Sequence, residues 1–314
     1  MIEISTASTV GKRHLGVSDL NVFPIAMSGN VFGWTADDAA AGAILDAFVS
    51  HGGNFIDTAD VYAAGRSETM IGNWMRSRRN RSELVIATKV GKGADNPGLA
   101  PRTLARAVDA SLARLGTDHI DLLYLHVDDL TVPFEETLLG VDALIRAGKV
   151  RWFGGSDHTG NRIIEARIAC GQLGVAPMVA LQKHYNLMHR AEYEGDLARV
   201  AASQSLGVMP RFALASGFLA GKYRGKADLV GHERSEATKY LGRRGLRVLA
   251  ALDIVAADLE ASVASVALAW LLTRANVVAP VVSATSADQV LDLVAAPALR
   301  LTRHHVADLE RASG

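Results

Sequence analysis

Short runs of apolar residues alternate along the chain with longer segments in which apolar residues recur every three or four positions. The short runs are continuously apolar, which is typical of strands buried on both faces of a parallel sheet. They occur at residues 23–26, 54–56, 84–87, 121–125, 151–154, 178–181, 207–209 and 278–282. This pattern predicts eight buried strands.

The segments between these runs show the periodicity of amphipathic helices. The segment 101–115 opens with a proline, which suits the first turn of a helix, and is followed by Gly116, which suits its end. Because consecutive parallel strands need helical crossovers, the alternation predicts an α/β fold, a (β/α)8 TIM barrel, formed by residues 1–314 as one domain. Helical patterns cover residues 37–51, 101–115, 134–147, 161–170, 194–206 and 261–273.

Two segments depart from the alternation. Residues 13–24 place Gly16, Ser18 and Asp19 between short extended pieces, which predicts an N-terminal β-hairpin closing the bottom of the barrel. Residues 221–244 are polar and rich in glycine and charge, which predicts a long, mobile loop on the side of the barrel where the strands end.

Charge and hydropathy exclude several classes of function. The 314 residues include 33 Lys and Arg and 33 Asp and Glu, whereas a sequence-independent nucleic-acid binder needs a basic excess. No apolar run approaches the roughly 18 residues of a membrane span, and the first residues lack the pattern of a signal peptide. We therefore expect a cytoplasmic globular protein with no nucleic-acid or membrane partner.

The chain also offers no pattern of a disulfide or a metal site. Cys170 is the one cysteine, and its place in an apolar helical pattern predicts a buried, inert thiol. His304 and His305 have no third ligand within range in the sequence. We expect no metal.

Polar residues follow the expected strands at the points where functional side chains lie in such a barrel. Asp57 and then Tyr62 follow the second strand, and Lys89 and His126 follow the third and fourth. Taken alone, each has an ordinary structural explanation, such as a capped turn or a core histidine. At consecutive strand ends, they together predict an active site in the mouth of the barrel. The next two strands are followed by Ser156, Asp157 and Gln182.

A tyrosine, a lysine, an aspartate and a histidine in one pocket suit acid–base catalysis. Tyrosine has an ordinary pKa of about 10, and a neighbouring ammonium lowers such a pKa by favouring the phenolate. A carboxylate beside the lysine holds the ammonium in place, and a histidine can orient a carbonyl group by donating a hydrogen bond. Such a set can protonate an alkoxide as it forms. It holds no obvious nucleophile, so the hydride must come from a cofactor.

Six motifs, in this order, resemble those of the aldo-keto reductases. The likeness runs from Leu15 to about Leu309, and the family's fold is the (β/α)8 barrel that the apolar pattern predicts independently. The motifs are Phe55-Ile56-Asp57-Thr58-Ala59-Asp60-Val61-Tyr62, Ala87-Thr88-Lys89, residues 111–118 with 120–126, residues 148–151 with 154–156, Gln182 with Tyr185-Asn186-Leu187, and residues 214–223.

The resemblance implies an NAD(P)H-dependent oxidoreductase that reduces a small aldehyde or ketone to an alcohol. Tyr62 would be the general acid, Lys89 with Asp57 would tune it, and His126 would position the substrate carbonyl. NADPH is the family's default cofactor, NADH is not excluded, and no oligomeric state is indicated. The resemblance assigns cofactor contacts to Ser156, Asp157, Gln182, Arg211, Leu214, Ser216, Gly217, Leu219, Ser283, Thr285 and Gln289.

Two residues depart from the family's pattern where the nicotinamide is held. Asp157 stands where the family usually has Asn, and Arg211 stands where it usually has an aromatic ring. An ionised carboxylate only accepts hydrogen bonds, and a guanidinium can stack but adds a positive charge. One hypothesis is a charge pair between the two across the cofactor site. The alternatives are a purely structural ion pair, or independent roles, for instance Arg211 gripping an acidic substrate.

The segment expected at the adenosine end argues only weakly for NADPH. Residues 285–288 lack the basic residue that often meets a 2′-phosphate, and Leu293 replaces an asparagine that is common near the adenine. Two other functions stay open. One is a cofactor-binding, redox-sensing barrel with little turnover, resembling potassium-channel β subunits, and the other is a barrel lyase or isomerase without a nicotinamide. The intact set of catalytic residues favours the reductase.

Overall fold

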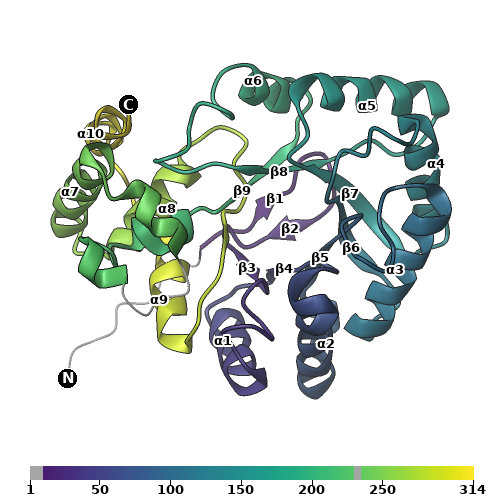
Figure 1. The fold of residues 1–314 in the computed structure, drawn as a ribbon, viewed down its shortest axis with the longest axis horizontal. Coiled ribbons are helices and arrows are strands. Elements are labelled where there is room, and N and C mark those ends of the chain that lie inside the picture. The colour runs from purple at the N-terminus through teal and green to yellow at the C-terminus, as the bar shows by residue number, and fades with distance from the viewer. Residues whose placement is uncertain (1–9, 230–234) are drawn as a thin grey trace.

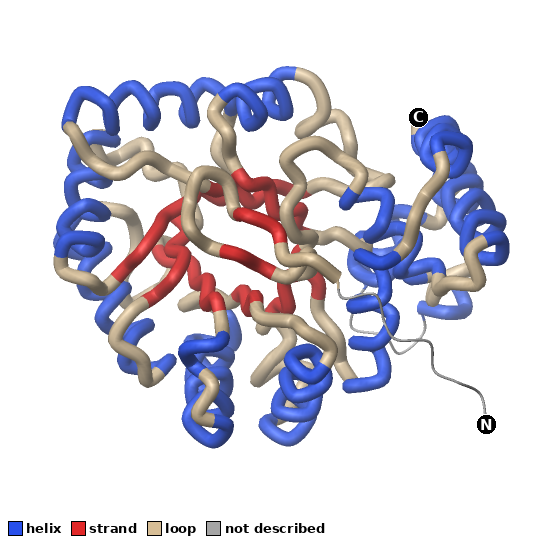
Figure 2. Tube along the Cα trace, turned by 180° about the vertical axis from the view of Figure 1, so that it is seen from behind, coloured by secondary structure: helices blue, strands red, loops and turns tan. Residues whose placement is uncertain are grey.

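The computed structural model describes residues 10–229 and 235–314. Eight parallel strands, in the order β10-β3-β4-β5-β6-β7-β8-β9, form a barrel with helices around its outside (Figure 1; Figure 2). The expected TIM-barrel fold is confirmed. The strands are β3 (Ala26–Ser28), β4 (Phe55–Asp57), β5 (Val85–Val90), β6 (Ile120–Leu125), β7 (Val150–Ser156), β8 (Ala180–His184), β9 (Gly207–Arg211) and β10 (Val281–Val282).

The barrel closes between β9 and the segment that leads into β10. The backbone N–H of Val208 donates to the carbonyl of Asn276 at 2.8 Å, and the N–H of Val278 donates to the carbonyl of Val208 at 2.9 Å. β10 in turn pairs with β3, with Val281 opposite Ala26. Because all eight strands run in the same direction, their C-terminal ends open on one side of the molecule.

The helices cover the outer face of the barrel. α3 shows why they form: it begins at a proline, buries Leu104, Val108 and Leu115 on one face, and ends at Gly116 with a left-handed φ of 62°. The helices are α1 (Asp38–Ser50), α2 (Arg66–Arg78), α3 (Pro101–Leu115), α4 (Phe134–Arg146), α5 (Gly160–Leu173), α6 (Asp196–Ser203), α7 (Arg243–Asp258), α8 (Val263–Leu272), α9 (Ala287–Ala295) and α10 (Arg303–Ser313).

An antiparallel hairpin of β1 (Arg13–His14) and β2 (Asn21–Val22) covers the bottom of the barrel, as expected from the sequence. Leu15 and Leu20 pack among the side chains that fill the barrel interior, such as Phe55. The hairpin therefore extends the barrel core instead of lying loosely against it.

Gly16 lies at the closest approach of this hairpin to the barrel. Its φ is +59°, and a Cβ atom there would lie 2.3 Å from the carbonyl oxygen of Val179. Both the left-handed backbone and the lack of space require glycine at this position.

The first barrel strand lies further along the chain than the expected 23–26. β3 covers Ala26–Ser28, because Pro24 has no N–H with which to join a ladder. The N–H of Phe23 instead donates to Oδ1 of Asn54 at 2.7 Å. Because the apolar pattern places this strand too early, it does not identify the strand's C-terminal end or the residues that follow it.

Part of the expected loop at 221–244 is helical in the residues that the structure describes. Lys226–Leu229 and Ser235–Tyr240 form short 3-10 helices, and α7 begins at Arg243. Residues 230–234 lie outside the described residues. The sequence patterns also missed α2, α7 and α9, whose polar outer faces dilute the apolar signal.

Side chains fill two regions, one inside the barrel and one between the barrel and its helices. Cys170 is buried in the outer region as a free thiol, as expected. Within residues 10–229 and 235–314, no single helix is long and apolar enough to span a membrane, although α7 and α8 pass that test as a pair bent by 95°.

Candidate active site

Asp57, Lys89 and Tyr62 meet at the end of the barrel where the strands finish. Asp57 ends β4, Lys89 lies in the neighbouring β5, and Tyr62 begins the 3-10 helix η1 (Tyr62–Gly65). Nζ of Lys89 donates to Oδ2 of Asp57 at 2.5 Å, to the carbonyl of Thr58 at 2.8 Å and to Oη of Tyr62 at 3.3 Å. The ammonium is therefore fixed beside the phenol by three acceptors.

The pair of Lys89 and Asp57 is enclosed by protein, with each side chain 1% exposed. Burial alone would lower the pKa of Lys89, but the contacts with Asp57 and Tyr62 outweigh burial and raise that pKa above its ordinary value. The other oxygen of Asp57 accepts a hydrogen bond from Nε2 of Gln182 at 2.9 Å. Lys89 is thus a charged donor to Tyr62 at neutral pH.

The backbone that follows Tyr62 is strained. Ala63 and Ala64 have left-handed φ values of 48° and 53°, a conformation that costs a residue with a Cβ about 1–2 kcal/mol. A Cβ on the next residue, Gly65, would lie 2.7 Å from Cδ of Arg114. Strain of this kind gathers at functional sites, where the surrounding structure imposes it.

His126 directly follows β6, and its ring lies edge-on to Tyr62 with 6.5 Å between the ring centroids. Burial, followed by the positive charges of Lys89, Lys92 and Arg211, lowers the pKa of His126 to about 3. The imidazole is therefore neutral at pH 7, and one ring nitrogen carries a proton. A neutral histidine in this place can donate a hydrogen bond to a carbonyl oxygen beside Tyr62.

Asp60 is a further buried carboxylate next to this site. It is 9% exposed, it interacts with the backbone N–H groups of Val61 and Gly91, and its Oδ1 has no hydrogen-bond partner among the described residues. Burial and then the neighbouring carboxylate of Glu68 raise the pKa of Asp60 to about 6, with Arg114 acting in the opposite direction. Asp60 thereby links the strained segment of Tyr62 to the loop after β5.

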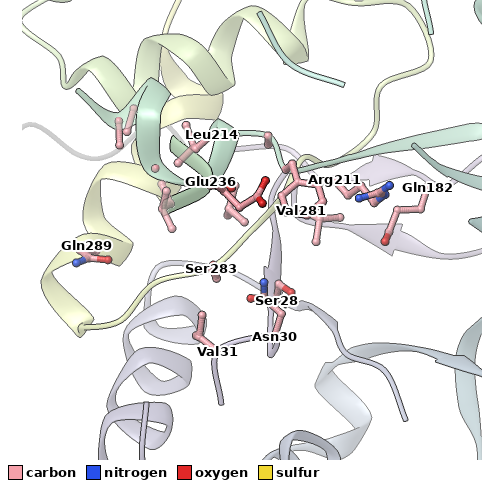
Figure 3. Close-up of a pocket in the computed structure, with 18 of the residues that line it drawn as sticks. Ser28, Asn30, Val31, Gln182, Arg211, Leu214, Glu236, Val281, Ser283 and Gln289 are labelled. Carbon is pink, nitrogen blue, oxygen red and sulfur yellow. Dashed lines mark hydrogen bonds between the residues drawn. The ribbon is translucent and has the colours of Figure 1, made fainter. Parts of the chain in front are cut away.

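The catalytic side chains open into a cavity of about 510 Å³. Tyr62 and His126 line it, while Asp57 and Lys89 lie buried behind them. Figure 3 shows Arg211 and Gln182 together at one end and Gln289 at the other, with Ser283 between them. A ligand that fills this cavity is elongated and has one end at the catalytic residues.

Most of the expected cofactor residues line this cavity, which does not by itself test their roles. Leu219 and Thr285 do not line it: Leu219 is fully buried, and the N–H of Thr285 donates to Oε1 of Gln289 at 3.1 Å. The expected residues that line the cavity are Ser156, Asp157, Gln182, Arg211, Leu214, Ser216, Gly217, Ser283 and Gln289.

The structure adds lining residues that the sequence patterns missed. Asn30 and Trp34 follow the first barrel strand, whose end had been placed too early, and Lys92 lies three residues beyond Lys89. Trp34 is 60% exposed and Phe212 is 48% exposed, so two aromatic rings face the cavity or its rim. Asn30 and Trp34 could have been identified from the sequence if the end of the first strand had been placed correctly.

Arg211 and Asp157 form the charge pair of the sequence hypothesis. Nη2 of Arg211 donates to Oδ2 of Asp157 at 2.7 Å, and Nε donates to Oδ1 at 3.3 Å. Their side chains are 30% and 35% exposed. Asp157 has a left-handed φ of 60°, and Lys183 approaches its Oδ1 at 3.9 Å. The contact is confirmed, and its role toward a cofactor stays a prediction.

The rest of the cavity is lined by a tight turn after β9 and by the N-terminus of α8. After β9, Ala215, Ser216 and Gly217 have left-handed φ values of 50°, 57° and 90°. They form a tight turn in which the N–H groups of Ala215 and Gly217 donate to the carbonyls of Phe212 and Leu214 at 2.8 and 2.9 Å. Ser262 caps the N-terminus of α8 and also lines the cavity. A helix N-terminus favours negative charge. In the part of the chain that the structure describes, no group of acidic, histidine or cysteine side chains is placed to hold a metal.

Comparison with known proteins agrees with this geometry. The model of the aldo/keto reductase family matches residues 25–313. A probable voltage-gated potassium channel subunit beta of Oryza sativa subsp. japonica is 32% identical, over 89% of this chain and 89% of the relative. Norsolorinic acid reductase B of Aspergillus parasiticus is 32% identical, over 96% of this chain and 79% of the relative. An aryl-alcohol dehydrogenase of Pestalotiopsis microspora is 31% identical, over 85% of this chain and 71% of the relative.

The match therefore covers the barrel from its first strand to its last helix, including the strand ends at which Asp57, Lys89 and His126 lie. The chain belongs to the aldo/keto reductase family.

Proposed function

We propose that the protein is an NAD(P)H-dependent carbonyl reductase that converts an aldehyde or ketone to an alcohol. The observation that carries this proposal is the hydrogen bond of 3.3 Å from Nζ of Lys89 to Oη of Tyr62, with the same ammonium held by Asp57. A phenol with a fixed positive charge at its oxygen can release a proton and hold the negative charge that remains. Family membership supports the broader assignment as an oxidoreductase.

The chain's own residues handle the proton and the orientation of the substrate. Tyr62 and the neutral His126 both donate hydrogen bonds to the carbonyl oxygen, and Tyr62 transfers its proton as negative charge develops there. Lys89 stabilises the phenolate that is left, and Asp57 keeps the ammonium charged and in place. A nicotinamide cofactor would supply the hydride to the carbonyl carbon when bound.

NADPH is our first candidate for the cofactor because it is the family's default. Its nicotinamide end would lie near Ser156, Gln182 and the Arg211–Asp157 pair. Gln289 and Ser283 line the other end, where the acidic Asp292 also lines the cavity. An acidic residue suits the free ribose hydroxyls of NADH better than a 2′-phosphate. Titration calorimetry with both cofactors separates these candidates.

We infer an aromatic aldehyde or ketone as the substrate class. Trp34 and Phe212 present exposed aromatic rings to the cavity, and such rings stack on planar ligands. The name of the aryl-alcohol dehydrogenase relative supports this choice. The physiological substrate and the expected cytoplasmic location stay predictions.

A second candidate is a cofactor-binding regulatory barrel with little turnover, because one relative is a probable channel subunit that this chain matches over 89% of its length. A panel of aromatic aldehydes, followed through the absorbance of the reduced cofactor, tests both. We expect turnover by the wild type and by Tyr193→Phe, which removes a buried hydroxyl that does not line the cavity. Tight cofactor binding without turnover would favour the regulatory barrel, and no cofactor binding would contradict both.

A further inference from the structure

The position of the redox end of the cofactor follows from the catalytic residues. Tyr62 and His126 fix the carbonyl oxygen, and hydride transfer needs the donor carbon within about 3–3.5 Å of the carbonyl carbon. The nicotinamide ring therefore occupies the part of the cavity that faces these two residues. Arg211 and Asp157 line the same cavity, and Arg211 lies close enough to His126 to lower its pKa. Asp157 is joined to the catalytic residues through Gln182, which accepts from the N–H of Asp157 and donates to Asp57.

Contacts within the protein hold the Arg211–Asp157 pair in place. The pair has two hydrogen bonds, at 2.7 and 3.3 Å, and the Arg211 guanidinium also lies over the ring of Phe212, 4.9 Å from its centroid. The N–H of Asp157 donates to the carbonyl of Gln182 at 3.0 Å, which fixes the carboxylate from its backbone. Both charges thus stay in the cavity wall.

The two forms of the cofactor differ in charge at the ring that faces this pair. Oxidised nicotinamide carries a positive charge, and reduced nicotinamide is neutral. Arg211 disfavours the oxidised ring and Asp157 favours it, so the two effects oppose each other in the wild type. In a site that is about one-third exposed, one unpaired charge at contact distance changes the relative affinity by about 3- to 10-fold.

We propose that the Arg211–Asp157 pair sets the relative affinity of this site for the oxidised and reduced forms of the cofactor. This inference rests on the proposed function, because it takes the cavity to hold a nicotinamide dinucleotide. Together the two residues let the site bind both forms, as a reductase that exchanges one form for the other requires. Each tenfold change in the ratio of dissociation constants corresponds to about 30 mV in the midpoint potential of the bound cofactor.

The test measures dissociation constants for both cofactor forms by calorimetry, in the wild type, Arg211→Gln, Asp157→Asn and the double variant. With Arg211→Gln, the ratio of the oxidised to the reduced dissociation constant should fall by about 3- to 10-fold, at the lower end because Lys183 still faces Asp157. With Asp157→Asn, the ratio should rise by a similar factor. The double variant should return to within about twofold of the wild type.

A matched control is Arg162→Gln, which breaks a similar half-buried pair with Asp128 outside the cavity. It should leave the ratio unchanged. If both single variants bind cofactor and shift the ratio in the same direction, or do not shift it, the charge discrimination is wrong and the proposed function stands. If the folded wild type binds neither form, the proposed function fails and the inference fails with it.

Discussion

Gln182 donates a hydrogen bond to Asp57 across the barrel, from β8 to β4, with 2.9 Å between Nε2 and Oδ1. These strands lie four places apart in a ring of eight, so the bond spans its full width. Lys89 takes the other carboxylate oxygen. The carboxylate of Asp57 therefore accepts from one cation, Lys89, and one neutral donor, Gln182. Removal of either donor would leave one buried carboxylate oxygen without its side-chain hydrogen bond.

Lys89→Met should destabilise the fold as well as the reaction. It leaves the buried Asp57 carboxylate with Gln182 as its remaining side-chain donor, and a buried pair broken on one side typically costs ~3–5 kcal/mol. Unfolding in urea measures the loss, and Asp57→Asn added to Lys89→Met should recover part of it. Equal stability of the single and double variants would contradict this account.

The same two positions should change the pH profile of kcat in the proposed reductase. In Lys89→Met, negative charge on the Tyr62 oxygen loses its nearest counter-charge, so the rate should fall most at neutral pH. Asp57→Asn should act in the same direction but less strongly, since the ammonium remains. Steady-state rates from pH 6 to 10 give the comparison, and an unchanged profile in Lys89→Met would remove lysine from the mechanism.

Tyr62→Phe should keep the fold and cofactor affinity while reducing turnover by ~10²–10⁴-fold, the usual contribution of general acid–base catalysis. The change removes only the hydroxyl that accepts from Lys89. Rates with an aromatic aldehyde, beside the Tyr193→Phe control, measure the effect. A Phe variant as fast as the wild type would show that another group donates the proton.

His126 should remain neutral throughout the working pH range. Its pKa of about 3 comes from burial and the surrounding cations, so its ring signals in an NMR titration should not move between pH 5 and 8. The spectrum of His126→Gln assigns those signals. Titration of His126 near pH 6.5 would mean that a cation, and not a neutral donor, meets the substrate carbonyl.

Asp60 should make the fold less stable as pH rises. The pKa of Asp60 is about 6 in the folded protein against an ordinary 3.8, so the folded form holds the proton longer and stability falls between about pH 4 and 6. Relative to Asp60→Asn, the wild type should lose about 2 kcal/mol between these limits. Denaturant unfolding of both proteins at pH 4.5 and 7.5 tests this, and a constant difference would show that Asp60 ionises normally.

Gly16→Ala should cost about 2–4 kcal/mol, because the new methyl group adds a clash with the carbonyl of Val179 to left-handed strain. Gly148→Ala is a matched control. Gly148 also has a left-handed φ, +72°, but no atom lies within 4 Å of the new methyl, so only about 1–2 kcal/mol should be lost. Similar losses in thermal unfolding would show that the hairpin does not depend on this close approach.

The sequence predicts the barrel and the catalytic cluster because both depend on local pattern. Buried parallel strands are continuously apolar, and Asp57 and His126 stand at their ends, so strand order alone brings them together. The charge pair of Arg211 and Asp157 could be predicted because both residues depart from a known pattern at once. Local pattern and family likeness were sufficient for these features.

Other features depend on contacts between distant segments. The bond from Gln182 to Asp57 needs the width and tilt of a closed barrel, which apolar runs do not specify. The burial of Asp60 depends on the packing of Glu68 and Arg114 around it. Trp34 was missed for a simpler reason, because the missing N–H of Pro24 displaces the first strand.

The residues for proton transfer and the residues proposed to hold the cofactor lie in different halves of the chain. Asp57, Tyr62, Lys89 and His126 all precede residue 127, whereas the residues proposed to hold the cofactor all follow residue 155. Recombination near α4 would therefore exchange the residues proposed to hold the cofactor while leaving the proton-transfer residues in place. Such an exchange must preserve Gln182. Among the described residues of the second half, it alone forms a side-chain hydrogen bond with Asp57. Cofactor preference can in this way evolve separately from acid–base chemistry.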